Sequence, residues 1–239
     1  MNTCQICQNK SYKESTYTYK CEKCSFIFSK LKSGTGRDII GLENLRRKNF
    51  KKIIFYLNKI YPKNLKKKLI LEIGSGDGFF IDECEKKNLK IYGSEANLKD
   101  YKYLKKRFKK IYFINFNKKI NLGKFDIIVF NDVFEHLKNL NIVIKNIKSL
   151  LKKNGIVILN LPSSDGIVYK ISKILYKLNI KNFYDRLWQK NQSSPHLSYF
   201  NNQNLNKLFK INNFKLILNT RLDTVDTKKN FKRINSALD

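Results

Sequence analysis

The stretch Leu71-Glu72-Ile73-Gly74-Ser75-Gly76-Asp77-Gly78 joins an apolar strand pattern to a helical pattern that begins at Phe79. Its glycines allow a tight turn and let the backbone approach a ligand closely at a helix N-terminus. The spacing is Gly-x-Gly-x-Gly, and Phe79 stands where the dinucleotide-binding pattern needs its third glycine. The stretch therefore predicts either an ordinary strand-to-helix turn or a ligand site that differs from the pyrophosphate site of NAD-dependent enzymes.

Strand and helix patterns alternate on both sides of this turn. Short strands rich in β-branched residues that alternate with amphipathic helices imply parallel pairing with right-handed crossovers. The fold class predicted is therefore a doubly wound, mainly parallel α/β sheet. Strands are expected at 69–73, 90–94, 111–114, 125–130 and 156–161, and helices at 50–61, 79–87, 98–108, 140–151 and 203–211.

The alternation stops after Leu161. A turn, Pro162–Gly166, leads into a segment with helical spacing that contains the only tryptophan, Trp188. An insertion after the carboxyl end of a strand lies at the crevice where open α/β sheets bind ligands. Residues 163–200 are therefore expected to form a helical cap that selects the substrate.

Four cysteines precede this domain as two Cys-x2-Cys pairs, a spacing that suits a tetrahedral, structural zinc ion. Two disulfides are the alternative, and they do not persist in the reducing compartment expected of a chain that shows no export signal. An isolated redox Cys-x-x-Cys is a weaker alternative, and Cys84, the fifth cysteine, is expected to be buried in an apolar helix. The predicted organisation is a zinc module at 1–30, a linker and amphipathic helix at 31–64, the main domain at 65–220 and a tail at 221–239. The predicted zinc ligands are Cys4, Cys7, Cys21 and Cys24.

Four segments, in their order and spacing, resemble successive motifs of the class I S-adenosylmethionine-dependent methyltransferases. They are LEIGSGDG at 71–78, the GSE that ends at Glu95, FDIIVFNDVFEHL at 125–137 and LLKKNGIVILNLP at 150–162. The resemblance covers about residues 65–220 and implies S-adenosyl-L-methionine as the cofactor. It implies that the glycines pack against the methionine and sugar moieties, that Glu95 binds the ribose hydroxyls, that Glu72 orients the amino group and that residues 115–117 contact the adenine. The expected cofactor-binding residues are Glu72, Gly74, Ser75, Gly76, Gly78, Glu95, Asn115, Phe116 and Asn131.

Asn154 and Asn213 stand where this family usually has glycine. Asparagine is the residue other than glycine that best tolerates a left-handed backbone. Both positions are therefore expected to remain turns.

The chain has two histidines, and both lie in contexts that resemble family elements. His136 follows the fourth strand in an EHL element that shapes the floor of the site in small-molecule enzymes, and His196 ends the cap in an H-x-x-x-F element. Asp132 and His196 are both expected to face the methyl group, and either is able to accept a proton from the acceptor. The predicted catalytic residues are His196, as the base, with Asp132 and His136; the alternative for His196 is that it only anchors the cap.

The formal charge is +30, from 49 Lys+Arg against 19 Asp+Glu among 239 residues. Only seven of the basic residues are arginine, whose planar fork is favoured for gripping phosphates and bases. Lysine is spread along the whole chain, so we expect a solvated surface and no nucleic-acid partner. Lysines of the cap (Lys170, Lys173, Lys177, Lys181 and Lys190) are compatible with an anionic, phosphate- or nucleotide-linked acceptor, and equally with a solvated helix face.

The resemblance implies O-methylation of a small molecule, a sugar or surface-polysaccharide precursor. The sequence has no run of 18 apolar residues and no signal pattern at Met1–Lys10, so we expect a cytoplasmic protein with no membrane span. A ribosomal-RNA methyltransferase is the alternative, although the fourth-strand motif has no Asn-Pro-Pro-Tyr-like element to hold a flipped base. A non-catalytic, cofactor-binding scaffold is the third possibility. The tail lacks a clear closing strand for the sheet.

Overall fold

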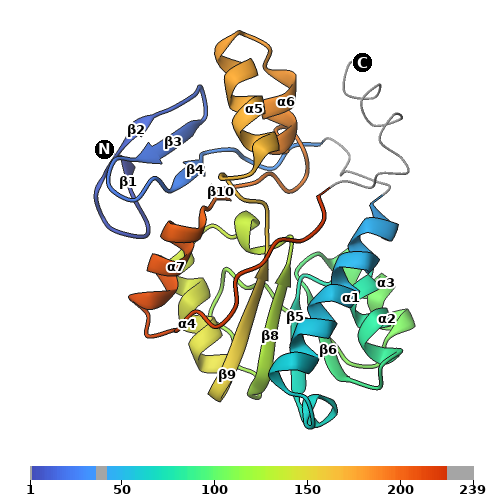
Figure 1. The fold of residues 1–239 in the computed structure, drawn as a ribbon. Coiled ribbons are helices and arrows are strands. Elements are labelled where there is room, and N and C mark those ends of the chain that lie inside the picture. The colour runs from blue at the N-terminus through green and yellow to red at the C-terminus, as the bar shows by residue number, and fades with distance from the viewer. Residues whose placement is uncertain (1, 36–41, 225–239) are drawn as a thin grey trace.

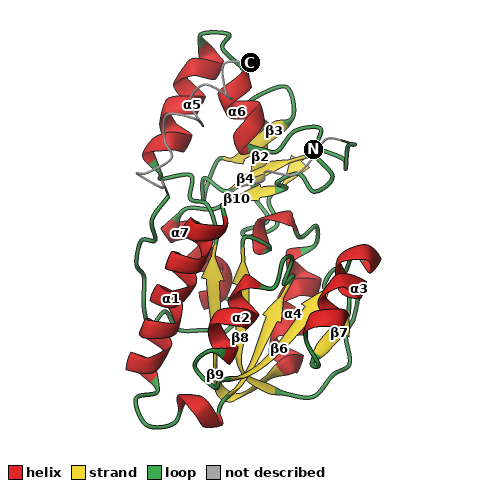
Figure 2. Ribbon diagram, turned by 90° about the vertical axis from the view of Figure 1, so that its right-hand side faces the viewer, coloured by secondary structure: helices red, strands yellow, loops and turns green. Residues whose placement is uncertain are grey.

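The computed structural model describes residues 2–35 and 42–224. Its larger part is a parallel sheet of order β7-β6-β5-β8-β9, with helices on both faces (Figures 1 and 2). The predicted doubly wound fold is therefore confirmed. The strands are β5 (Leu69–Ile73), β6 (Lys90–Glu95), β7 (Ile111–Phe113), β8 (Phe125–Asn131) and β9 (Leu151–Asn160).

Alternate side chains of the strands enter two hydrophobic cores, one on each face of the sheet. On β8, Ile127 and Val129 pack with the first three helices, while Ile128 and Phe130 pack with α4 and α7. All four side chains are fully buried, as expected for a central parallel strand covered on both faces. The helices of this domain are α1 (Glu43–Ile60), α2 (Phe79–Glu85), α3 (Leu98–Arg107), α4 (Leu140–Leu150) and α7 (Asn202–Lys210), with the short 3-10 helices η1 (Leu65–Lys67) and η2 (Phe134–His136).

Asparagine side chains begin three of these helices. Asn97, Asn139 and Asn201 accept hydrogen bonds from backbone N–H groups in the first turns of α3, α4 and α7. These bonds satisfy donors that have no partner within the helix. The abundant asparagine of this chain thus sets the helix boundaries locally.

Asn154 and Asn213 have φ of 62° and 65°, so the expected left-handed backbone is present at both positions. Asn213 lies in a turn, as predicted, whereas Asn154 lies inside β9 and not in a turn. The boundary before Asn154 differs from the prediction, because β9 already begins at Leu151. Leu151 pairs with Phe125, and the register then shifts before Ile127 pairs with Ile156. Between these two pairs β9 has more residues than β8, and the surplus residues around Asn154 cause the shift in register. Hydrophobic periodicity does not predict such an irregularity.

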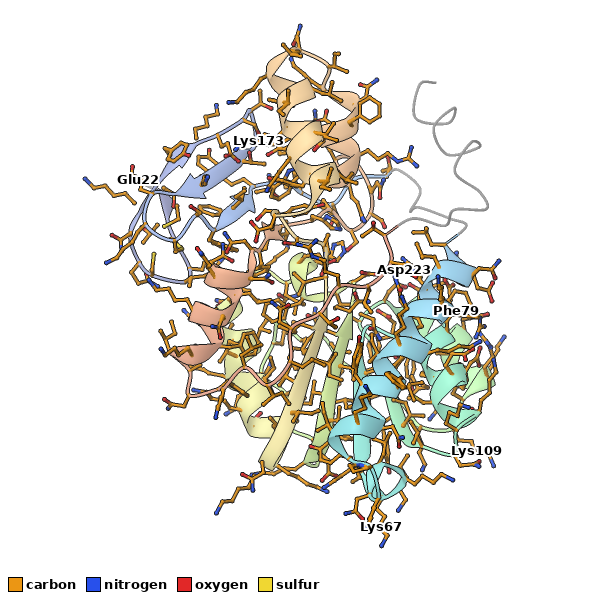
Figure 3. All side chains as sticks on the ribbon, in the orientation of Figure 1. Glu22, Lys67, Phe79, Lys109, Lys173 and Asp223 are labelled. Atoms are coloured by element: carbon orange, nitrogen blue, oxygen red, sulfur yellow. The ribbon has the colours of Figure 1, made fainter. Side chains whose placement is uncertain are left out.

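Beyond α7, the described residues 211–224 form no strand, so within the described chain the sheet ends at β9. This segment returns to α1, where Asp223 accepts a hydrogen bond from Lys52 (2.7 Å) and bonds through its backbone to the Asn49 side chain. Figure 3 shows Asp223 beside the upper end of α1. Most of the predicted tail, residues 225–239, lies outside the described residues.

The N-terminal residues form a second sheet of order β1-β2-β3-β4-β10, which is antiparallel throughout. Its fifth strand comes from the end of the predicted cap, where Ser198 and Tyr199 pair with Phe28 and Ile27. The sequence analysis does not anticipate this pairing. The strands are β1 (Asn2–Thr3), β2 (Lys10–Lys13), β3 (Thr18–Cys21), β4 (Ile27–Ser29) and β10 (Ser198–Tyr199).

The predicted cap is helical, and its helices α5 (Ile167–Lys177) and α6 (Asn182–Leu187) rise beside the N-terminal sheet (Figure 1). Tyr17 donates a hydrogen bond to Asp185 at 2.7 Å, and Thr18 lies 3.2 Å from the hydroxyl of Tyr184. The helices thus pack on the N-terminal sheet. The segment after them, 194–200, reaches the carboxyl ends of the strands.

Candidate functional site

The glycine turn between β5 and α2 has the left-handed backbone that its residues permit. Gly74, Gly76 and Gly78 have φ of 68°, 50° and 78°. A side chain at Gly74 would lie 2.6 Å from Val133, whereas a Cβ at Gly76 would meet nothing within 4 Å. The middle of the turn therefore faces open space, as a turn that holds a ligand against its backbone requires.

The carboxylate of Glu95 is held beside this turn at the end of β6. It accepts hydrogen bonds from the backbone N–H groups of Ala96 (2.8 Å), Asn97 (3.2 Å) and Gly76 (3.2 Å). These bonds fix the carboxylate at the edge of the turn. In this position it is able to accept the two hydroxyls of a ribose.

Glu72 is buried beneath the turn. Its Oε1 accepts a hydrogen bond from Asn131 at 2.9 Å, whereas Oε2 has no partner among the described residues. Burial raises the pKa of Glu72 to about 8, although the Asn131 bond opposes the shift. A buried carboxyl with one oxygen that lacks a hydrogen-bond partner is suited to accept a hydrogen bond from the ammonium of a bound amino acid moiety.

The side chains of Ser75 and Phe116 make contacts within the protein. The Ser75 hydroxyl accepts a hydrogen bond from the backbone of Ser94 at 3.3 Å, which ties the turn to β6. The ring of Phe116 is buried and packs edge-on against Phe130, with centroids 5.3 Å apart. The Phe116 ring thus belongs to the core, and an adenine contact by Asn115 or the backbone of 115–117 stays a prediction.

A substitution at Glu72 should reveal its shifted pKa in the protein without cofactor. The folded state binds more protons than the unfolded chain between about pH 4.5 and 8, so its stability falls as the pH rises through this range. We expect Glu72→Gln, which cannot ionise, to flatten this decline and to be more stable than the wild type at pH 9.

Urea unfolding at pH 6 and pH 9 measures the effect, and Glu85→Gln, an exposed carboxylate on α2, is the control. Parallel pH profiles for wild type and Glu72→Gln would show that Glu72 ionises normally in the folded protein.

Asp132 and His136 lie in the segment after β8, and the ring of His196, from the end of the cap, lies against His136. The His136 and His196 rings are 4.7 Å apart, centroid to centroid, and Asp132 lies 3.8 Å from the guanidinium of Arg46. Asp132 has φ of 53°, and its backbone N–H donates to Asn160 on β9 at 2.8 Å. Limited solvation raises the pKa of Asp132, while Arg46 opposes the shift.

Glu135 is the residue of this cluster that the sequence analysis missed. Its side chain is fully buried, and neither carboxyl oxygen has a hydrogen-bond partner in the described part of the chain. Its Oε1 lies 3.9 Å from Nε2 of His196. Burial, together with the charge of Asp132, raises the pKa of Glu135 well above its usual range. The only signal in the sequence is a glutamate that stands between Phe134 and His136.

His196 is also buried. Its burial, and to a smaller extent the nearby His136, lower its pKa to about 3. Its imidazole is therefore neutral near pH 7, with a lone pair on one ring nitrogen. A group of low pKa is a weak base, so the structure favours no single base among the predicted residues.

The His196 segment is clamped between the two sheets. Its neighbour Pro195 accepts a hydrogen bond from His136 Nδ1 (3.0 Å), and Leu197 donates to the backbone of Glu135 (2.9 Å). On the other side, Ser29 of β4 donates through its hydroxyl to the carbonyl of His196 (2.8 Å). The N-terminal sheet therefore positions His196.

The four N-terminal cysteines form one cluster, with their sulfur atoms all within 4.8 Å of one another. Cys4 Sγ lies 3.5 Å from Cys24 Sγ, and Cys7 Sγ lies 3.4 Å from Cys21 Sγ. Tetrahedral zinc–sulfur bonds of about 2.3 Å place sulfurs about 3.8 Å apart, so the donor set and spacing fit zinc. Cys84 is buried apart from them, as predicted, and burial raises its thiol pKa.

Two of the five cap lysines are held in ion pairs. Lys173 pairs with Glu14 of the N-terminal sheet, and Lys190 pairs with Asp185 at 2.8 Å. Figure 3 shows Lys173 on the side of α5 that faces this sheet, while Lys67 and Lys109 project from the surface of the larger domain. Among the described residues, every helix is too short or too polar to span a bilayer.

Comparison with known proteins gives a family match. A family model described as a methyltransferase domain matches residues 42–219. No curated protein sequence matches the chain.

Solved structures share the fold. Magnesium protoporphyrin IX methyltransferase from Synechocystis, solved with bound S-adenosylhomocysteine, aligns with a TM-score of 0.59 and 14% identity, covering 80% of this chain and 84% of that one. The YcgJ protein of Bacillus subtilis aligns with a TM-score of 0.51 and 13% identity, covering 69% and 67%. The chain covers 39% to 59% of the length of the first four structures found.

Proposed function

The chain belongs to the methyltransferase-domain family, with the fold of class I S-adenosylmethionine-dependent enzymes, and we propose that it methylates a hydroxyl of a small molecule, a sugar or surface-polysaccharide precursor. One observation carries the proposal. Asp132 and His136 lie in the segment after β8, whose Val133 packs against Gly74 of the glycine turn, and the ring of His196 lies against His136. Donor and acceptor sites are thus adjacent at the carboxyl edge of the sheet.

The predicted cofactor residues have fitting environments. Gly76 faces open space, and Glu95 is fixed at the turn by hydrogen bonds. The buried Glu72 has one oxygen without a hydrogen-bond partner among the described residues. S-adenosylmethionine supplies an activated methyl group when bound. The protein's part is then to hold the acceptor in line and remove its proton, and both tasks fall to residues after β8.

We also propose that zinc fills the four-cysteine site and has a structural role. Four protein ligands leave no open position at the ion, so this zinc would not activate a water molecule. The thiolate donor set and the spacing of the sulfur atoms support this proposal. The zinc ion would stabilise the sheet that holds His196.

An assay for the transferred methyl group tests the proposal. The purified protein is incubated with S-adenosylmethionine carrying an isotopically labelled methyl group, and with sugars, sugar phosphates, nucleotide sugars or ribosomal RNA. We expect label on an oxygen of a sugar-type acceptor. Label on ribosomal RNA alone would favour the RNA-modifying alternative, and tight cofactor binding without transfer to any acceptor would favour the scaffold.

Glu95→Gln should weaken cofactor binding. A hydrogen bond to a charged group contributes about 1.5–3 kcal/mol, so the dissociation constant of S-adenosylmethionine should rise roughly tenfold to hundredfold. Calorimetric titration measures the dissociation constant, with Glu85→Gln, an exposed carboxylate at the end of α2, as the control. Unchanged affinity would remove Glu95 from the cofactor site.

A further inference from the structure

The buried carboxylate of Glu135 has no compensating partner. It is 0% exposed, and both of its oxygens lack hydrogen-bond partners in the described chain. Arg46, a cation on the same side of the site, pairs instead with Asp132 at 3.8 Å. A buried carboxyl ionises only where a cation lies close enough to compensate its charge, and a bound metal ion would supply that charge at this position.

Two imidazoles face the same point. One ligand atom from each of Glu135, His136 and His196 lies within 4.8 Å of the others. Nδ1 of His136 lies 3.0 Å from the carbonyl of Pro195 and 3.2 Å from the hydroxyl of Ser194. The carbonyl can only accept, so the proton lies on Nδ1, with the hydroxyl as a second acceptor, and the lone pair lies on Nε2. This hydrogen bond orients the ring in the way that carbonyls orient metal-binding histidines.

We propose that Glu135, His136 and His196 bind a divalent zinc-class ion, separate from the four-cysteine site, with open positions for the acceptor hydroxyl. Two imidazoles and one carboxylate form the ligand set of catalytic zinc, whereas magnesium prefers oxygen ligands. Ligand atoms on a tetrahedral ion with bonds of about 2.1 Å lie about 3.4 Å apart. Binding would therefore draw this group together by about 1 Å.

The ion's role in transfer rests on the proposed function, whereas its binding does not. A bound cation lowers the pKa of a coordinated hydroxyl, which offsets the weak basicity of the surrounding side chains. The hydroxyl proton passes to Asp132. The oxygen forms its bond to the methyl carbon as the sulfur–methyl bond breaks, and the electron pair remains on sulfur in S-adenosylhomocysteine.

Counting metal ions tests the site. Full-length, tag-free protein is loaded with zinc, dialysed and measured for zinc per chain. We expect two ions in the wild type, and one in Glu135→Gln and in His136→Asn, whose amide can keep the bond to Pro195. Asp132→Asn, a neighbouring carboxylate outside the ligand set, is the matched control and should keep two.

Cobalt distinguishes the two sites. The first cobalt equivalent should give intense thiolate charge-transfer absorption from the cysteine site, and the second only the weak visible bands of nitrogen and oxygen ligands. A single ion in the wild type, or two in both Glu135→Gln and His136→Asn, would overturn the site. Two ions without methylation of any hydroxyl acceptor would overturn the proposed function alone, and transfer that persists after selective loss of the second ion would overturn its catalytic role.

Discussion

Cys24→Ala should remove the zinc that we propose for the N-terminal sheet and reduce methyl transfer at least a hundredfold, although no cysteine belongs to the cluster around His196. Zinc binding contributes about 10–16 kcal/mol to small zinc-folded units, which equals or exceeds the net stability of most domains. The sheet it holds supplies β4, which pairs with β10 and binds the carbonyl of His196. Loss of the ion therefore displaces a catalytic candidate.

Zinc content, circular dichroism and the methyl-transfer rate measure this effect. Cys84→Ala is the matched control, because Cys84 is buried in the helix α2 and lies outside the cluster. It should keep its zinc and most of its activity. A zinc-free Cys24→Ala protein with wild-type turnover would show that the N-terminal sheet does not position the site.

His196→Ala should lower kcat roughly 10²- to 10⁴-fold, the range that activation of the acceptor hydroxyl contributes. The loss is expected because the variant lacks one of the three side chains that would hold the activating ion. The affinity for S-adenosylmethionine should stay unchanged, because the contacts of His196 are to Glu135, His136 and Tyr199 rather than to the glycine turn.

Tyr176→Phe is the control for disturbance of the cap. It removes the Tyr176–Thr16 hydroxyl contact (3.1 Å) at the outer end of α5 and leaves the His196 segment intact. Its turnover should be near that of the wild type. Full turnover in His196→Ala would exclude His196 from the mechanism.

The sequence predicts the larger domain well because its signals are local. Strand and helix periods and the left-handed Asn154 each depend on neighbours a few residues away. The β4–β10 pairing joins two residues to a strand far away in the sequence, and such a short segment carries no periodic pattern. Glu135 was missed for a similar reason, since only packing from several segments makes it a buried, unpartnered charge.

The position of Phe116 shows what the motif at residues 115–117 does not determine. The motif places residues 115–117 after β7, where the family contacts the adenine, but it does not determine the direction of each side chain. The structure turns the Phe116 ring into the core against Phe130. A residue can therefore match the motif without touching the ligand.

The pairing of β4 with β10 also bears on how the protein is made. On the ribosome, β10 is synthesised roughly 170 residues after β4, which at 5–20 residues per second means about 10–30 s. During that interval the nascent N-terminal segment lacks its last strand, and Phe26 and Ile27 lack the apolar surfaces that bury them in the finished protein. The part of the chain that emerges first is thus completed late, and early capture of zinc or of a chaperone would protect it from aggregation while translation continues.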